Sequence, residues 1–299
     1  MKRRIGILLL VLFSISCGVR NVKTEPVPQV RDFPSVTIPG MITDPAGRVV
    51  WLSEHFWDKF TDTSALYHCD SVTINGVTQE NVEKQMGIFA TLLKDIPLQK
   101  GEKAMTTLYE RLEAFQMAKP EGNVFQEVSS LASRYFYDPN SPVRSEDLYL
   151  PFVSRMENSP LTDEADKGVY AWDRAVCSQN RTGTIAADFP YIDGEGRRRT
   201  LYGVKADWTL LIFGNPDCNA CREIKQMLEE TPEVSALLES GALARVEVNP
   251  DDYDFFSGED RLYAIRAVPS LYLLDRDKRI IKKDALPEDV LGILRQIPR

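Results

Sequence analysis

The stretch FGNPDCNACR, residues 213–222, decides how the C-terminal part of this chain folds. It overlaps the continuous apolar run WTLLIFG at residues 208–214, which has the length of a strand that is covered on both faces. A helix is expected from about Asn219. Cys218 and Cys221 therefore stand at the junction of a buried strand and a helix.

This position favours thiol chemistry at the C-x-x-C pair. The unpaired N–H groups at the start of a helix stabilise an anion, so they favour the thiolate of Cys218. Cys221 follows almost one turn later, and its sulfur can approach that of Cys218. We expect Cys218 to attack a disulfide of a substrate and Cys221 to resolve the mixed disulfide. Such a site needs no metal and no organic cofactor.

The sequence on both sides of the pair alternates between strand and helix patterns. We expect a hairpin at 188–202, strands at 208–214, 243–248, 270–275 and 278–283, and helices from about 219 and at 287–296. The alternation predicts an α/β layer over residues 181–299, with helices on both faces of a mixed sheet.

The segment YAIRAVPS, residues 263–270, resembles the part of thioredoxin that ends in its cis-proline, in both order and spacing from the cysteines. The resemblance extends over residues 183–299 and implies a thioredoxin-like fold. It also implies that the Val268–Pro269 bond is cis, that Pro269 shapes the substrate groove, and that the backbone of Val268 pairs with the substrate chain as an added strand.

Three positions depart from the thioredoxin pattern. Asp217 stands where thioredoxins usually carry Trp, Ile212 falls at the buried acid that assists proton transfer, and Arg245 falls at the lysine partner of that acid. The acid role is therefore unassigned. Asp217 opposes the thiolate while Arg222 favours it, and the balance points to a reductant or an isomerase more than to a strong oxidant.

The N-terminus predicts export and a lipid anchor. Lys2, Arg3 and Arg4 precede an apolar run at 5–15 that is too short to span a bilayer, as in a secretory signal. Residues 14–18, SISCG, resemble a bacterial lipoprotein cleavage box in which Cys17 receives the lipid. A plain cleaved signal is the alternative. We expect residues 1–17 to be the signal peptide and 18–37 a tether rich in Pro and Val.

Residues 38–180 carry apolar positions at helical spacing and predict a helical domain. The expected helices are 52–60, 79–95, 103–117, 123–136, 144–156 and 164–178, the fifth kinked or split at Pro151. This half resembles an uncharacterised domain that precedes thioredoxin modules in Gram-negative lipoproteins, a resemblance that names no activity. The fold class is thus two-domain α+β, all-helical and then thioredoxin-like.

Composition and cysteine use limit the partners. The net charge of −8 argues against nucleic acid. His55 and His68 are the only histidines, both in the helical half, so a zinc site at the C-x-x-C pair lacks ligands. In an oxidising compartment a Cys69–Cys177 disulfide is an open alternative, because spacing does not fix connectivity.

Taken with the hairpin at 188–201, which resembles that of membrane-anchored thioredoxin-like reductases, these features predict a thiol-disulfide oxidoreductase on the periplasmic side of the outer or inner membrane. Its substrates would be disulfides or dithiols of exported proteins. Its electron donor would be a membrane reductase or another thioredoxin-like protein. Two other hypotheses remain: a non-catalytic, lipid-anchored binding or assembly protein, and a peroxidase.

Overall fold

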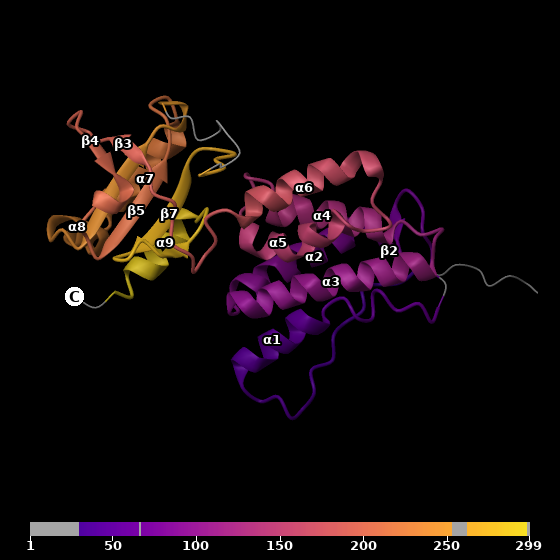
Figure 1. Cartoon of the computed structure of the whole chain (residues 1–299). Helices are drawn as coiled ribbons and strands as arrows, with labels where there is room; N and C mark the ends of the chain where they lie inside the picture. The colour runs from indigo at the N-terminus through magenta and orange to yellow at the C-terminus, as the bar shows by residue number, and fades with distance from the viewer. Residues whose placement is uncertain (1–29, 66, 253–261, 298–299) are drawn as a thin grey trace, which may run out of the picture.

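The computed structural model describes residues 30–65, 67–252 and 262–297 and contains two domains side by side, one helical and one α/β (Figure 1). The order along the chain agrees with the predicted fold class. In these three ranges no helix is both long enough and apolar enough to cross a membrane. Cys17 and most of the predicted tether lie outside the described residues.

The described part of the first domain contains six helices. They are α1 Pro45–His55, α2 Gln79–Lys94, α3 Leu98–Ala118, α4 Val124–Phe136, α5 Glu146–Met156 and α6 Glu164–Ser178. The last five lie within a few residues of their predicted ranges. The first was misplaced at 52–60, because Asp44 and Pro45 form its N-terminus: Asp44 Oδ1 accepts the Gly47 N–H at 2.6 Å.

Helix α5 runs through Pro151 without a break, contrary to the expected split. Its buried side chains lie on both sides of the proline, at Leu148 and Tyr149 before it and at Phe152 and Val153 after it. Their packing into the common core with α3, α4 and α6 outweighs the loss of one helical hydrogen bond at Pro151.

Two features of the helical domain were not predicted. A short hairpin of β1 Thr73–Ile74 and β2 Val77–Thr78 turns at Asn75 and Gly76, which both have positive φ. The end of the predicted tether also packs on this domain: the Phe33 ring stacks on Phe60 at 5.1 Å between centroids.

The second domain is built on a four-stranded sheet with the order β6-β5-β7-β8. These strands are β5 Trp208–Phe213, β6 Leu243–Val248, β7 Ser270–Asp275 and β8 Ile280–Lys282, and β3 Pro190–Ile192 with β4 Arg198–Thr200 forms a separate hairpin. Strand β5 is parallel to β6 and antiparallel to β7. The predicted strands and hairpin are confirmed, the last strand being shorter than expected.

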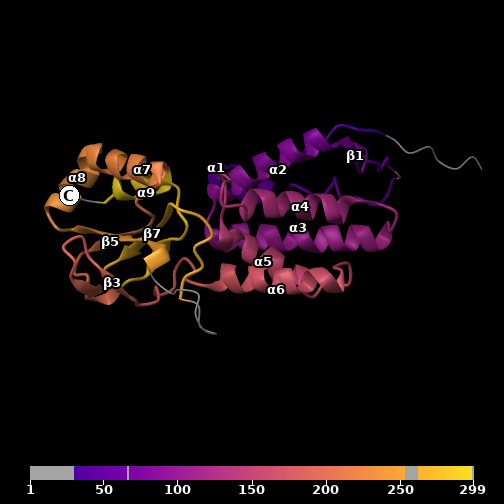
Figure 2. The same ribbon diagram turned by 90° about the horizontal axis from the view of Figure 1, so that it is seen from above.

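The two faces of the sheet have different covers. Helices α7 Asn219–Glu230, α8 Pro232–Glu239 and α9 Pro287–Leu294 lie on one face, and the β3–β4 hairpin lies on the other (Figure 2). Leu210 and Ile212 pack toward the helices, whereas Leu211 and Phe213 pack toward the hairpin. In the described part of the chain the expectation of helices on both faces is wrong, because aromatic side chains beside the hairpin fill the second face.

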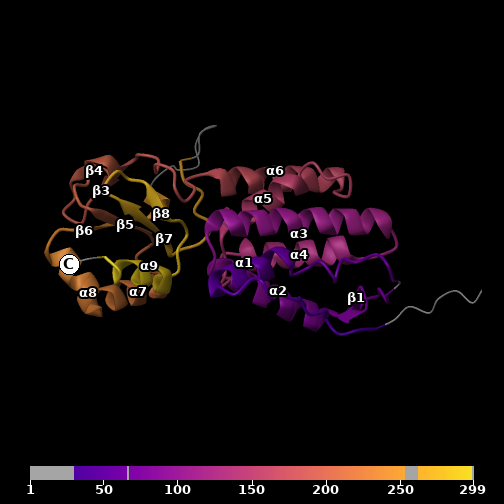
Figure 3. The same cartoon turned by 90° about the horizontal axis from the view of Figure 1, so that it is seen from below.

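Strands β7 and β8 lie nearer the helical domain than β6, as the view from below shows (Figure 3). The sheet therefore presents β7 and the segment before it toward the helices of the first domain.

Helix α8 was not predicted, although Thr231 and Pro232 give it an ordinary start, with Pro at the first helical position.

Candidate functional site

The register of the sheet brings the two predicted site segments together. Phe213, the last residue of β5, pairs with Ser270, the first residue of β7. Gly214 and Pro269 continue from that pair at the same edge of the sheet. The Val268–Pro269 peptide bond is cis, as predicted. The C-x-x-C loop and the cis-proline segment thus leave the sheet side by side.

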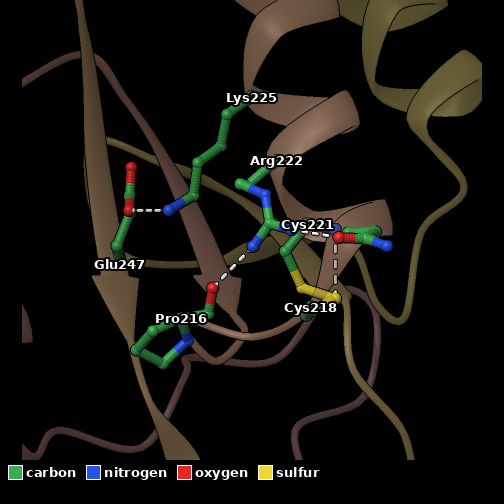
Figure 4. The surroundings of a disulfide bond; sticks show 7 residues. Pro216, Cys218, Cys221, Arg222, Lys225 and Glu247 are labelled. Atoms are coloured by element: carbon green, nitrogen blue, oxygen red, sulfur yellow. Dashed lines mark hydrogen bonds and ion pairs between the residues drawn. A yellow bond between two sulfur atoms is a disulfide. The ribbon is translucent and has the colours of Figure 1, made fainter.

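Cys218 is the N-cap of α7, and its sulfur lies at the start of the helix (Figure 4). The Cys218 Sγ accepts the backbone N–H of Cys221 at 3.0 Å. A thiolate at this atom would keep the same donor and the positive end of the helix dipole, both of which stabilise the anion. Local sequence and helix geometry therefore provide the electrostatic support that the C-x-x-C pair requires.

The two cysteines form a disulfide with 5.2 Å between their Cα atoms. Cys218 is half-buried and Cys221 is buried, so Cys218 is the more accessible cysteine of the pair. A Cβ added at Gly214 would lie 2.9 Å from the Cys221 Sγ. Glycine at position 214 thus allows the backbone leaving β5 to pass close to Cys221.

Arg222 binds the loop in front of the helix. Its Nη1 donates to the Pro216 carbonyl at 2.7 Å, and its Nη2 donates to the Asn219 side chain (Figure 4). These bonds hold the turn that carries Asp217 against the first turn of α7. The sequence indicated the charge of Arg222 but not this role in fixing the loop.

An ion pair that sequence reasoning missed lies beside the disulfide. Lys225, one turn after Cys221 on α7, donates to Glu247 on β6 (Figure 4). Glu247 Oε1 also binds Arg245 Nε at 2.9 Å. The signal was available, because Arg245 and Glu247 are two apart on a strand and therefore share a face.

The structure places the other positions that depart from the thioredoxin pattern as follows. Ile212 is buried among the apolar side chains under α7, so β5 itself supplies no acid there. Glu247 is the in-register partner of Ile212 on β6. A carboxylate thus lies on the strand next to Ile212, the position at which the thioredoxin pattern has its buried acid.

Behind the site lies a group of packed aromatic rings. Tyr263 is fully buried, its ring centroid is 5.1 Å from that of Phe213, and its hydroxyl donates to the Ala187 carbonyl at 2.8 Å. Burial raises the pKa of Tyr263 well above its usual range, so this phenol stays protonated. The group packs against Phe213 and so supports the end of β5.

The other two described cysteines are free and apart from this site. Cys177 is buried near the end of α6, and burial raises the pKa of its thiol far above the usual range. Cys69 is partly exposed in the helical domain. The open alternative of a Cys69–Cys177 disulfide is thus not realised. No three His, Cys, Asp or Glu side chains in the described ranges gather as a metal site would require.

We predict that Gly214→Ala lowers the free energy of unfolding by about 1–3 kcal/mol, because the new Cβ overpacks against Cys221. Gly292→Ala is the control: its Cβ would meet nothing within 4 Å, so the change should be neutral or stabilise α9 by up to about 1 kcal/mol. Urea unfolding of both variants checks this, and equal stability of the two would contradict the close approach at Gly214.

We also predict that iodoacetamide modifies Cys69 and spares Cys177 in the native, oxidised protein lacking residues 1–17. The reason is that alkylation requires an accessible thiolate, and Cys177 has neither access nor a favourable pKa. Peptide mass mapping should show one modified cysteine, and two after unfolding in urea. Native modification of Cys177 would contradict its burial.

Solved structures of other proteins are similar to this chain. A thioredoxin-like protein from Bacteroides caccae has a crystal structure that matches with a TM-score of 0.72 and 29% identity, over 89% of this chain and 99% of that one. The C-terminal domain of an uncharacterized Bacteroides fragilis protein is 32% identical over 39% of this chain and 99% of its own length, with a TM-score of 0.34.

A third solved structure is the thioredoxin domain of a thiol-disulfide oxidoreductase from Bacteroides vulgatus, which is 20% identical over 39% of this chain and 96% of its own length, with a TM-score of 0.29. None of the curated proteins matches this chain. The family model described as Domain of unknown function (DUF5106) matches residues 16–180, which is more than half of the chain. The chain therefore belongs to the DUF5106 family and joins that helical domain to a C-terminal thioredoxin-like domain.

Proposed function

We propose that this protein is a thiol-disulfide oxidoreductase of the cell envelope that acts on disulfides of exported proteins. One observation carries the proposal: the Cys218–Cys221 disulfide lies at the start of α7, and the cis Val268–Pro269 segment leaves the sheet beside it. A reactive sulfur and a backbone that can pair with an extended chain are the two parts that disulfide exchange with a polypeptide needs.

The reaction balances with the two cysteines and one substrate disulfide. In the reductive direction the Cys218 thiolate attacks one substrate sulfur, a mixed disulfide forms, and the other substrate sulfur leaves as a thiolate that takes a proton. Deprotonated Cys221 then attacks the Cys218 Sγ and releases the second substrate thiol. The substrate gains two electrons, the protein becomes the disulfide seen here, and an external dithiol must reduce it again.

We further propose the reducing or isomerising direction. Arg222 directs two of its nitrogens to Pro216 and Asn219, while Asp217 carries its negative charge beside Cys218. The Cys218 thiolate is then stabilised mainly by the N-terminus of α7. A moderately stabilised thiolate corresponds to a moderate reduction potential of the cysteine pair. The dithiol donor would be a membrane reductase or another thioredoxin-like protein.

We predict that the chain lacking residues 1–17 reduces insulin disulfides, and that Cys218→Ser lowers the rate to background because the attacking sulfur is lost. Cys221→Ser should accumulate a mixed disulfide with substrate, since release is blocked. In glutathione buffers, a reversible couple with a potential of about −270 mV would mark a reductant. Cys69→Ser, which leaves the pair intact, is the matched control.

Absence of both a reversible couple and turnover would contradict the proposal and favour a non-catalytic binding or assembly protein. Consumption of hydrogen peroxide that depends on Cys218 and exceeds disulfide reduction would instead favour a peroxidase. Both assays use the same protein samples.

We propose a lipid on Cys17 as the anchor to the membrane. In cells supplied with labelled palmitate, the wild-type chain should carry label in the membrane fraction. Cys17→Ser should lose the label and move to the soluble fraction, because cleavage of the signal peptide without lipidation leaves the chain without a membrane anchor. Label retained in Cys17→Ser would contradict this site.

A further inference from the structure

The segment that carries the cis-proline is attached to the helical domain before the proline. Arg266, two residues before Val268, lies over the Tyr137 ring with 3.8 Å from its Cζ to the ring centroid. Its Nε donates to Glu146 Oε1 at 2.9 Å, and its Nη1 donates to the Tyr137 carbonyl. Both partners belong to the helical domain: Tyr137 directly follows α4, and Glu146 is the first residue of α5.

The same segment is attached again after the proline. Ser270 follows Pro269 directly, and its Oγ donates to Asp284 Oδ1 at 3.2 Å. The other oxygen of Asp284 accepts from Nε of Arg144 of the helical domain at 3.0 Å. Residues 266–270 are therefore fixed at both ends by contacts that lead to the loop and first turn of α5.

Glu146 is the centre of these contacts and is almost fully buried. Its second oxygen binds Lys283 Nζ at 2.7 Å, and the side chain of Lys283 is only 3% exposed. Lys283 also donates to the carbonyls of Cys177 and Gln179 at the end of α6, at 3.2 and 2.5 Å. Buried and multiply bonded charges hold their geometry, because separation would leave one of them unpaired.

Little space remains between the domains at this point. The hollow lined by Pro139, Arg144, Arg266 and Pro269 has a volume of about 10 Å³, enough for about one water molecule and no peptide. Ala267, in contrast, is exposed. A substrate chain must therefore approach the cis-proline segment from the side away from α5.

We infer that the helical domain, through Glu146, Tyr137 and Arg144, positions the cis-proline segment to receive an extended polypeptide carrying a disulfide. The inference rests on the proposed function and gives the DUF5106 domain a role in it. A segment held in place loses less conformational entropy when a substrate strand pairs with it. The benefit belongs to polypeptide substrates, since a small disulfide needs only the sulfur of Cys218.

The test uses Arg266→Gln and Arg144→Gln in the chain lacking residues 1–17. Arg266→Gln leaves Glu146 paired with Lys283, so no buried charge is stranded and the variant should fold. Arg134→Gln is the control, because it removes an exposed arginine that pairs with Glu83 on the outside of the helical domain. A peptide disulfide and a small aromatic disulfide, dithionitrobenzoate, serve as substrates.

We expect KM for the peptide disulfide to rise about fivefold or more in both variants, corresponding to the ordering cost of a few side chains and a short segment. The rate with dithionitrobenzoate and the potential of the Cys218–Cys221 couple should stay at wild-type values, as should every readout of Arg134→Gln. Unchanged KM in both variants would overturn the inference. A parallel loss with both substrates would also overturn it, because it would show general damage to the site.

Hydrogen exchange separates this inference from the proposed function. Amides of residues 263–271 should exchange faster in Arg266→Gln, while those of 218–230 should not change, whether or not the protein turns over. If the wild-type protein shows no turnover with either substrate, the proposed function fails. Amide hydrogen exchange alone then tests whether the helical domain positions the cis-proline segment. Unchanged exchange at 263–271 would then overturn it.

Discussion

The buried carboxylate of Glu146 is the contact on which the relation between the two domains depends. It receives Arg266 on one oxygen and Lys283 on the other, and both partners come from the thioredoxin-like domain. A buried carboxylate without any cationic partner would cost several kcal/mol, so Glu146 requires at least one of its two partners. Loss of Glu146 itself would leave the buried ammonium of Lys283 without a carboxylate, a change that typically costs about 3–5 kcal/mol. Buried polar contacts centred on Glu146 therefore join the two domains.

The ends of two helices stabilise the buried charges of Glu146 and Lys283. Glu146 lies in the first turn of α5, where the positive end of the helix dipole stabilises a carboxylate. Lys283 lies at the last carbonyls of α6, where the negative end stabilises an ammonium. The start of α5 and the end of α6 face the same neighbour, and each end meets a side chain of the opposite sign.

Much of the fold could be predicted from the sequence because its signals are local. Helical periodicity in 79–178, the apolar run of β5 and the C-x-x-C at the start of α7 each depend on a few adjacent residues. Features that depend on distant residues escaped. Glu146 and Arg266 are 120 residues apart in the sequence, and no spacing rule joins either of them to the other or to Lys283. No local pattern identifies Tyr137 as the residue over whose ring Arg266 lies.

The thioredoxin comparison shows how a family pattern can mislead about proton transfer. It directed attention to Ile212 and Arg245, and both are present in the expected strands without the expected acid. Since the side chain of Ile212 packs under α7, a charge there would be buried without a partner. The neighbouring strand accommodates Glu247 instead, because Lys225 and Arg245 neutralise it from two sides. Ile212 and Glu247 are in-register neighbours on β5 and β6, so the acid of this domain lies one strand away from the position in the thioredoxin pattern, where two cations balance its charge.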